Sequence, residues 1–398
     1  MRRPARRALP LAAFAAALAV AAPTSAWAEP LPALNDTEPL DFTAEALALS
    51  SVVACDGRPF DTARFDAALV AEHCKALDAI FDRYQREWLA KARPFFAALV
   101  PADLPKTVVY PFGGADLLTA LVVYPDLREI TSFSLEAGGD PRAFATLDKG
   151  RLARSLALHR RFLDKLVTVN HSRTLDLGQL KGDPLPSQVV FALVGLEVHG
   201  YEPVRLRYFR LEPDGSLRYL TARDVTLGEQ ALSGASGSMA YRKRAELFGN
   251  VELVFRKVGG GPEQVYRHVS ANLDDTHLGE DGRALAHLAS KGKVAAMTKA
   301  ASYLLWWHNF DTVRAQLLSQ MVWMVSDSTG VPPNLLDLSV FEIETYGQFR
   351  HTAIKGSAAG EAAYRQAWEE QPQRELPFMF GYPARAQTAH LVVTRRKK

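Results

Sequence analysis

The sequence predicts an α/β fold in which helices cover both faces of a mostly parallel sheet. Residues 107–110 and 129–135 are short β-branched runs separated by a helical pattern. Two strands joined by one helix need a crossover connection, which implies parallel pairing. The apolar run Met-Val-Trp-Met-Val at 321–325 is typical of a strand buried on both faces. These runs together favour a layered sheet over an all-helical or all-β structure.

The first 28 residues predict a secretory signal. Four arginines and no acidic residue stand in the first seven positions, and the apolar run at 8–22 is short for a membrane span. Ala26-Trp27-Ala28 places small residues at the two positions that a signal peptidase reads, so we expect cleavage before Glu29. An uncleaved anchor is the alternative. We therefore expect a periplasmic or secreted protein that is soluble after processing.

Composition excludes several classes of partner. Removing residues 1–28 leaves 43 basic residues against 44 acidic ones, so the mature chain is close to neutral. A neutral chain lacks the basic surplus that nucleic acids and anionic membranes attract. No later segment is apolar for long enough to span a bilayer. We expect no nucleic-acid binding and no membrane span after cleavage.

The two cysteines, Cys55 and Cys74, are expected to form a disulfide. They are the only cysteines in the chain and lie 19 positions apart, and an exported protein meets an oxidising compartment. The bond would tie the loop at 56–59 to the helix that follows. Two separate buried thiols are the alternative.

Residues 29–100 are expected to form a helical segment that packs on an α/β domain at 101–398. Apolar side chains recur at three- and four-residue steps over 65–88, which indicates one face against a core. Asp61-Thr62 is the expected cap of this helix, and Pro94 is expected to end it.

The remainder of the chain alternates helical and extended patterns. Helices are expected at 115–123, 141–175, 187–198, 283–310, 312–318 and 362–368. Hairpins inserted in the domain are expected at 204–211 with 217–220 and at 251–258 with 264–269, because each pair flanks a glycine turn. Residues 232–239 are expected to be a surface loop, and further strands are expected at 341–346, 378–380 and 390–394.

Two polar turns follow predicted strands, at Tyr110–Asp116 and at Ser326–Gly330. Ligands in open α/β sheets bind beyond the carboxyl ends of strands, so we expect these turns to border one pocket. The residues expected to bind the ligand are Tyr110, Gly113, Gly114, Asp116, Glu136, Lys299, Asp327 and Ser328. The alternative is that Gly113-Gly114 permits a tight turn while the two aspartates cap helices.

Glu136 stands 22 residues beyond Gly114, at the end of the next predicted strand. Nucleotide-binding sheets place there the acid that holds a ribose. Together with the glycine turn and two late strands, this arrangement resembles the core of Rossmann-like methyltransferases over residues 105–140. The resemblance implies a Rossmann-like three-layer sheet. The turn has only two glycines and S-adenosylmethionine is a cytoplasmic cofactor, so we expect the fold without the activity and without a cofactor.

The sequence is also similar to a set of bacterial exported proteins of uncharacterised function. The likeness lies in YPFGGAD at 110–116, KAASYLL at 299–305 and DSTGVP at 327–332, which keep their order along the chain. It implies a shared fold and assigns no catalytic role to any residue.

Signals for other chemistry are weak. Three motifs at 290–293, 326–328 and 355–357 imitate those of penicillin-recognising enzymes, but their spacings are too short. Asp274–His277 is expected to be a turn that caps a helix rather than a metal site, and no metal is expected.

Lys299 is expected on a helix. It is either a buried base or anion hook, or a stem that covers Trp306 and Trp307 while its charge reaches solvent, and the second reading is favoured. No nucleophile is evident. We therefore expect non-catalytic binding of a small molecule or an envelope protein. The alternative is an enzyme with a degenerate methyltransferase-type site that uses acidic residues at strand ends.

Overall fold

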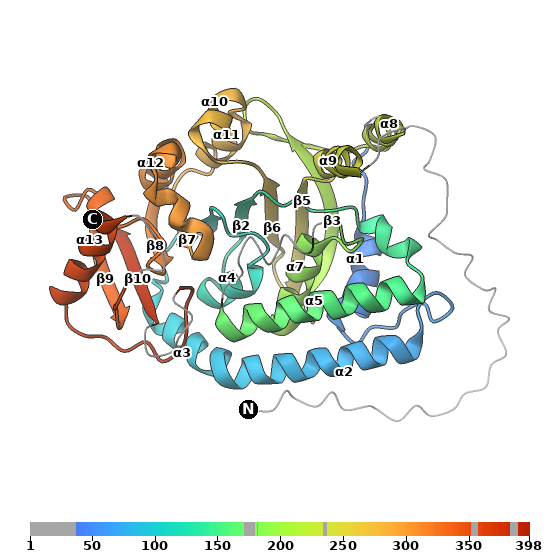
Figure 1. Cartoon of the computed structure of the whole chain (residues 1–398), viewed down its shortest axis with the longest axis horizontal. Coiled ribbons are helices and arrows are strands. Elements are labelled where there is room, and N and C mark those ends of the chain that lie inside the picture. The colour runs from blue at the N-terminus through green and yellow to red at the C-terminus, as the bar shows by residue number, and fades with distance from the viewer. Residues whose placement is uncertain (1–36, 171–179, 181, 234–236, 352–356, 383–388) are drawn as a thin grey trace.

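The computed structural model describes residues 37–398 except 171–179, 181, 234–236, 352–356 and 383–388. The predicted signal at 1–28 lies outside the described residues. The described part contains one sheet with the strand order β4-β3-β5-β6-β2-β1-β7-β8-β10-β9 (Figure 1). The strands are β1 Thr107–Tyr110, β2 Glu129–Ser134, β3 Tyr201–Leu211, β4 Leu217–Tyr219, β5 Asn250–Lys257, β6 Gln264–Ser270, β7 Val294–Thr298, β8 Met321–Ser326, β9 Phe341–Gly347 and β10 His390–Arg396.

The centre of the sheet is parallel, which confirms the predicted α/β fold. The neighbouring parallel strands are β6, β2, β1, β7 and β8. In chain order they are the third, second, first, fourth and fifth of the set, which is the order of a Rossmann-like sheet. On one side β3, β4 and β5 continue the sheet as antiparallel hairpins, and on the other β10 lies antiparallel between β8 and β9. Both predicted hairpins are confirmed, and they extend the central sheet.

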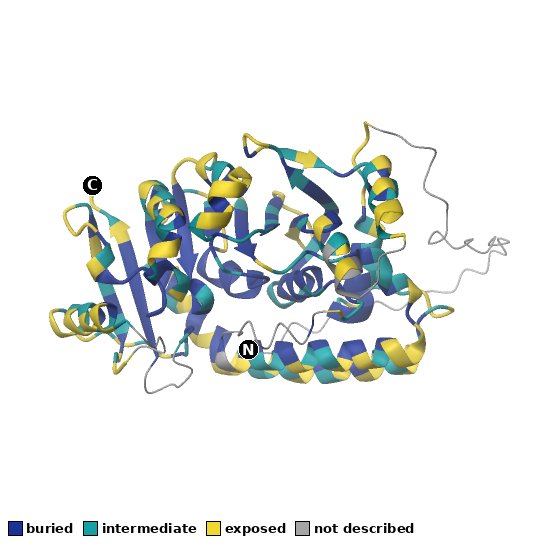
Figure 2. Ribbon diagram, turned by 45° about the horizontal axis from the view of Figure 1, so that its top comes forward, coloured by how far each residue is buried: buried dark blue, intermediate teal, exposed yellow. Residues whose placement is uncertain are grey.

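Helices cover both faces of the sheet. On one face α4 (Leu117–Val123) and α7 (Ser187–His199) pack next to the strands, and the long helices α2 (Ala67–Tyr84) and α5 (Lys149–Val169) form an outer layer (Figure 1). On the other face lie α10 (Asp275–Glu280), α11 (Arg283–Ala289) and α12 (Asp311–Gln320). A separate apolar core fills each side, and the strands between them are buried (Figure 2).

Helix α7 is apolar on nearly all sides and is buried accordingly. Gly195 lets it approach α4 closely, since a Cβ there would lie 3.2 Å from the backbone nitrogen of Leu118. The helix ends at Gly200, whose φ of 73° is the left-handed conformation common at helix C-termini. This packing holds the first turn of α7 at the edge of the sheet where the parallel strands end.

The N-terminal segment is helical as predicted, and its side chains share the core of the sheet face that carries α7. It comprises α1 (Thr43–Leu49), the π-helical turns η1 (Ser50–Ala54) and η2 (Gln85–Leu89), α2, and α3 (Ala90–Leu99). Two details were wrong. The cap of α2 is Asp66, which accepts from the backbone of Leu69, and not Asp61-Thr62. Pro94 lies inside α3, which continues from the wider turn of η2, and does not end the helix.

Cys55 and Cys74 form the predicted disulfide, with Cα atoms 5.5 Å apart. Cys55 ends η1 in a left-handed conformation with φ of 60°, and Cys74 lies on α2. The bond therefore ties the loop after η1 to the following helix, as expected.

The largest correction concerns residues 283–310. This stretch was predicted to be one helical region, but only α11 and the short 3-10 turns η5 (Ala300–Trp306) and η6 (His308–Phe310) are helical, and β7 lies between them. Helix α11 ends at Ala289, Gly292 follows in the turn with φ of 66°, and the alanine-rich run after it pairs with β1 and β8 in the middle of the sheet. Burial between two strands thus outweighs the helix propensity of alanine.

Several shorter expectations also change. The helix predicted at 141–175 divides into the 3-10 turn η3 (Pro141–Thr146) and α5, and 171–179 lie outside the described residues. The loop predicted at 232–239 holds the end of α8 (Ala222–Leu232) and the start of α9 (Gly237–Leu247). No strand forms at the described residues 378–380. A 3-10 turn, η7 (Pro333–Leu335), and α13 (Ala358–Glu369) complete the described helices.

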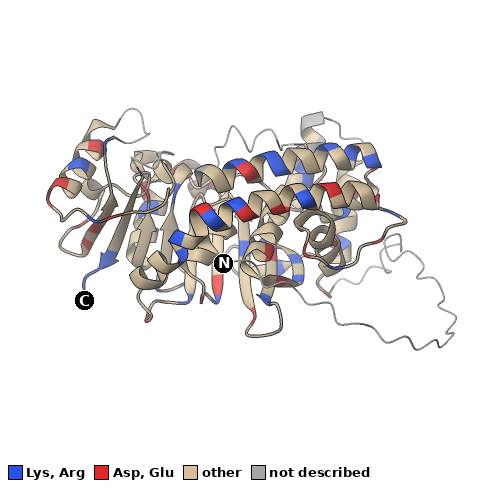
Figure 3. Ribbon diagram, turned by 90° about the horizontal axis from the view of Figure 1, so that it is seen from below, with Lys and Arg blue, Asp and Glu red and all other residues tan. Residues whose placement is uncertain are grey.

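The outward faces of α2 and α5 carry acidic and basic side chains interspersed (Figure 3). Within the described part of the chain, no helix is long and apolar enough to cross a bilayer.

Candidate functional site

A recess of about 80 Å³ opens where β1, β2 and β7 end. The chain leaves β1 for β2 on one side, and β7 lies on the other side of β1, so the strand order reverses at this point. Ligands of open α/β sheets bind at such switch points. Six of the predicted ligand-binding residues line the recess, namely Tyr110, Gly113, Gly114, Asp116, Glu136 and Lys299.

A buried ion pair joins Lys299 and Asp116 at the wall of the recess. The Lys299 Nζ atom lies 2.6 Å from Asp116 Oδ2, and the two side chains are 1% and 8% exposed. Nζ also donates to Thr119 Oγ1 at 2.9 Å and to Asn170 Oδ1 at 3.3 Å. All three protons of the ammonium group therefore have an acceptor. The favoured prediction, in which the Lys299 stem covers the tryptophans and its charge reaches solvent, was wrong. Lys299 directly follows the buried strand β7 and does not lie on a surface helix.

Asp116 has two roles. It caps α4 by accepting from the backbone of Thr119 at 3.2 Å, which is the expected alternative reading of this residue. Its other oxygen accepts from the hydroxyl of Tyr110 at 3.1 Å. Burial, and then the charge of Asp116, raise the pKa of Tyr110, so the hydroxyl stays protonated and donates. Capping and ion pairing are thus combined in one carboxylate.

Backbone strain gathers around this ion pair. In the described chain four residues other than glycine have positive φ, and three of them border the recess or contact Lys299: Phe112 at 58°, Asn170 at 53° and Ala300 at 59°. Asparagine tolerates this region, whereas phenylalanine and alanine are strained in it. Such strain tends to persist where the surrounding structure needs it, and functional sites are one such place.

The glycine turn is filled from within. A Cβ on Gly113 would lie 2.4 Å from Cγ of Tyr110, so glycine is needed there to accommodate the aromatic ring. Gly114 adopts φ of 54°, and its carbonyl accepts from Ser132 Oγ at 2.6 Å and Tyr266 hydroxyl at 3.0 Å. The tight-turn reading of both glycines is therefore correct, and the turn also forms part of the recess wall.

Asp327 and Ser328 lie outside the wall of the recess. Asp327 is fully buried and accepts from the backbone nitrogens of Ala300 at 3.2 Å and Tyr382 at 2.7 Å. Burial raises the pKa of Asp327. Ser328 is also fully buried and is in hydrogen-bond contact with Nε2 of His390. The expectation that Ser326–Gly330 borders the same pocket was wrong. Asp327 instead lies beneath the recess wall and accepts from the backbone of Ala300, in the turn that follows Lys299.

Glu136 joins the recess to a much larger cleft of about 1270 Å³. It follows the end of β2, where its backbone carbonyl accepts from His268 Nε2 at 2.7 Å, and its side chain is partly exposed. Leu135 lines both cavities as well and is 65% exposed. The two cavities therefore share one polar and one apolar lining residue, Glu136 and Leu135, at the carboxyl end of β2.

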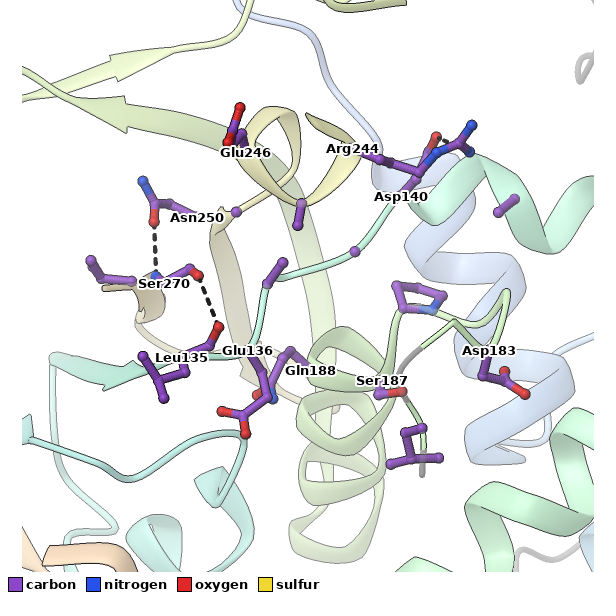
Figure 4. A pocket seen from close by; sticks show the side chains of 18 of the residues that line it. Leu135, Glu136, Asp140, Asp183, Ser187, Gln188, Arg244, Glu246, Asn250 and Ser270 are labelled. Atoms are coloured by element: carbon purple, nitrogen blue, oxygen red, sulfur yellow. Dashed lines mark hydrogen bonds and ion pairs between the residues drawn. The ribbon is translucent and has the colours of Figure 1, made fainter. Parts of the chain in front are cut away.

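The large cleft extends from the ends of β2 and β6 to the first turn of α7 (Figure 4). Its wall includes Asp183, Ser187 and Gln188, which the sequence reasoning did not select. Ser187 Oγ lies 3.0 Å from Nε2 of His159, which comes from α5. Ser187 and His159 are 28 positions apart, and the sequence around them matches no recognised catalytic motif. They meet because α5 packs beside α7. No single-sequence signal marks them.

Among the described residues no cluster of three or more histidine, cysteine, aspartate or glutamate side chains fits a metal ion. Asp274 caps α10 by accepting from the backbone of His277, as expected.

Comparison with known proteins adds no identification. No protein-family model matches the sequence, and neither curated proteins nor solved structures give a match.

Proposed function

We propose that the protein binds a small molecule bearing hydroxyl or amino groups at the carboxyl edge of its sheet, and that it does so without chemistry in the recess. The observation that carries this proposal is the convergence of three chain segments, those after β1, β2 and β7, on one recess at the switch point. A concave cavity with a few convergent polar groups favours a small ligand over a protein partner.

Glu136 is the acceptor that we expect the ligand to use. The oxygens of Asp116 already accept from Lys299, Tyr110 and the backbone of α4. Glu136 stands between the recess and the cleft with its side chain partly exposed. A carboxylate accepts hydrogen bonds and donates none, so it selects hydroxyl and amino groups. Leu135 supplies an apolar surface for the carbon skeleton beside it.

The test is a thermal-shift screen of sugars, polyols and primary amines, with the corresponding carboxylic acids as negative probes. A ligand should raise the melting temperature of the native protein and of Glu246→Gln, a substitution elsewhere on the cleft wall. It should protect Glu136→Gln less, because the neutral amide keeps one acceptor oxygen but loses the negative charge and replaces the second oxygen by an NH2 donor. Absence of any protection, or equal protection in Glu136→Gln, would contradict the proposal.

A second candidate is an enzyme with a degenerate methyltransferase-type site. The strand order of the parallel centre and the antiparallel β10 beyond β8 support this resemblance. The Tyr110 ring weighs against it, because the ring packs against Gly113 and fills the turn that a cofactor would approach. Calorimetry with S-adenosylhomocysteine separates the candidates, and we expect no binding heat.

We also propose that the protein works outside the cytoplasm, in the periplasm or as a secreted protein. The Cys55–Cys74 disulfide supports this, because such bonds persist in oxidising compartments. The test is the N-terminal peptide of the protein recovered from the culture or periplasm. We expect it to begin at Glu29, whereas a retained Met1 in exported protein would contradict cleavage. The likeness to uncharacterised exported proteins stays a prediction.

A further inference from the structure

A serine in the wall of the large cleft contacts a buried histidine. Ser187 is the first residue of α7 and is partly exposed to the cleft, whereas His159 is fully buried behind it on α5. The distance from Ser187 Oγ to His159 Nε2 is 3.0 Å. A nucleophile and its general base need a contact of this length, with the nucleophile on the accessible side.

The surroundings of His159 determine which of its nitrogens accepts. Nδ1 lies 2.9 Å from the backbone carbonyl oxygen of Ser155, which can only accept, so Nδ1 carries the proton. Burial lowers the pKa of His159, and the ring is therefore neutral at pH 7. Nε2 is then unprotonated, and the Ser187 hydroxyl donates to it. This is the tautomer that a general base requires.

A carboxylate stands near the far side of the histidine. Asp183 Oδ1 lies 3.9 Å from His159 Nδ1, beyond hydrogen-bond range but close enough for its charge to favour an imidazolium. Asp183 Oδ2 accepts from the hydroxyl of Ser155 at 2.9 Å, which holds the carboxylate in place. The carbonyl of Ser155 orients the ring, and Asp183 supplies the negative charge; in a Ser-His-Asp triad one carboxylate does both.

The first turn of α7 offers donors where an oxyanion would form. The first intrahelical bond of α7 runs from Val190 to the carbonyl of Pro186, so the preceding N–H groups have no acceptor within the helix. Pro186, at the cap position, makes no side-chain cap. Those N–H groups and the helix dipole favour negative charge beside Ser187.

Gln188 independently indicates a ligand at this turn. It lines the cleft, is 2% exposed, and its Oε1 atom has no hydrogen-bond partner among the described residues. Figure 4 shows its side chain extending from the start of α7 toward the end of β2, where Glu136 stands. A buried amide oxygen without a partner is costly unless something else bonds it. A substrate hydroxyl or N–H group would complete it.

We propose that Ser187, with His159 as its general base, hydrolyses carboxylic esters in the large cleft. Ser187 Oγ attacks the ester carbonyl while its proton passes to His159 Nε2, and the N–H groups of the first turn of α7 bind the oxyanion. The tetrahedral adduct collapses, the C–O bond breaks, and the alcohol leaves with the proton from Nε2. Water then attacks the acyl-serine, gives its proton to Nε2, and the acid is released as Ser187 recovers that proton.

The substrate class follows from the wall of the cleft. Gln188 Oε1 lacks a hydrogen-bond donor, which a substrate can supply, and Leu135, which is 65% exposed, provides apolar surface. An ester of a hydroxylated or amide-bearing compound satisfies these groups. The inference goes beyond the proposed ligand binding and does not depend on it, because neither Ser187 nor His159 lines the recess.

The test uses the full chain and two probes, a fluorophosphonate that phosphonylates activated serines with loss of fluoride, and p-nitrophenyl butyrate. Peptide mass spectrometry of the labelled native protein should place the adduct on Ser187. Ser187→Ala should lose labelling and reduce ester hydrolysis at least a hundredfold. The matched control is Ser270→Ala, on the same cleft wall, whose hydroxyl points to the carbonyl of Leu135 and which should keep both activities.

Folded native protein that takes up no label, or that is labelled elsewhere, overturns the proposal. Ester hydrolysis that persists in Ser187→Ala also overturns it. Because the adduct is mapped on the native protein, the result stands even if a variant unfolds. Labelling of Ser187 without any ligand protection would contradict only the recess proposal, whereas ligand protection that depends on Glu136 without labelling of Ser187 would contradict only the esterase proposal.

Discussion

Two ion clusters lie on the same sheet, one buried and the other partly exposed. One is the Lys299–Asp116 pair at the carboxyl edge, which borders a recess and lies among residues with strained backbone. The other centres on Arg267 of β6, which bridges Glu129 on β2 and Glu252 on β5 at 2.5 and 2.9 Å. Neither described cavity is lined by the second cluster.

The second cluster follows from strand register. Arg207, Glu252 and Arg267 occupy directly opposed positions on β3, β5 and β6, so their side chains share one face of the sheet. Arg207 lies 2.7 Å from Glu252, and Lys291 contacts Glu129 at the other end. Alternating charges on neighbouring strands stabilise a sheet locally. No additional element, cavity or strain is required, and we interpret this cluster as structural.

The difference teaches that buried charge alone is weak evidence for a site. Both clusters hold opposite charges in contact. Only the Lys299 pair also lies at a cavity, at the switch point of the strand order and beside the strained residues Phe112 and Ala300. Perturbed or buried ionisable groups cluster at functional sites, yet structural networks contain them too. The combination of independent features, rather than the charge, distinguishes the two.

The largest expected effect on stability comes from removing one lysine from each cluster and comparing the two variants. Lys299→Met leaves Asp116 buried without its cation, so the free energy of unfolding should fall by about 3–5 kcal/mol. Lys291→Met should cost about 1 kcal/mol, because Arg267 still pairs with Glu129, whose side chain is 21% exposed. Chemical denaturation of both variants measures the difference. Equal losses would break the distinction between a sealed pair and a redundant network.

Acid should weaken the second cluster. Burial alone would raise the pKa of Glu129, but the charges of Lys291 and Arg267 outweigh it and lower the pKa to about 2. A carboxyl group with a lowered folded-state pKa stabilises the protein above its unfolded value near 4.5 and loses that contribution as the pH falls toward 2. We expect about 2–3 kcal/mol of such loss.

The Glu129→Gln variant identifies the source of this acid dependence. Its free energy of unfolding should be lower than that of the native protein at pH 7, and the gap should close between pH 5 and pH 2. Urea denaturation across this range measures both curves. A gap that stays constant with pH would show that the carboxylate of Glu129 does not stabilise the fold through its charge.

The smallest effect concerns the strain at the recess. Ala300 has φ of 59° and is buried, whereas Ala296 is a buried residue of the regular strand β7. Replacing either by glycine removes one methyl group, but only Ala300→Gly also relieves a left-handed backbone, worth about 1 kcal/mol. Ala300→Gly should therefore be more stable than Ala296→Gly by about that amount in matched thermal denaturation. Equal melting temperatures would mean that the recess stores no strain at Ala300.

Much of the site could be predicted because its parts follow local rules. Thr107–Tyr110 is followed by a glycine turn and a helix, and parallel strands end at one edge, so Asp116 and Glu136 were expected near each other. The placement of Lys299 depended on a strand that an alanine-rich sequence does not indicate. The prediction that Asp327 lines the recess was wrong. The turns after β1 and β8 end at the same edge of the sheet, but the turn after β8 does not reach the recess.

By itself, the sequence determined most of the elements, the parallel pairing of β1 with β2, both hairpins and the Cys55–Cys74 pairing. Each of these depends on short-range patterns of side chains or on the two cysteines being the only ones in the chain. Only the tertiary structure decided the strand status of β7, the sealing of Lys299 and the meeting of Ser187 with His159. These depend on which elements pack together. That choice is made by the burial of whole surfaces, to which each residue contributes too little to be recognised in its local sequence.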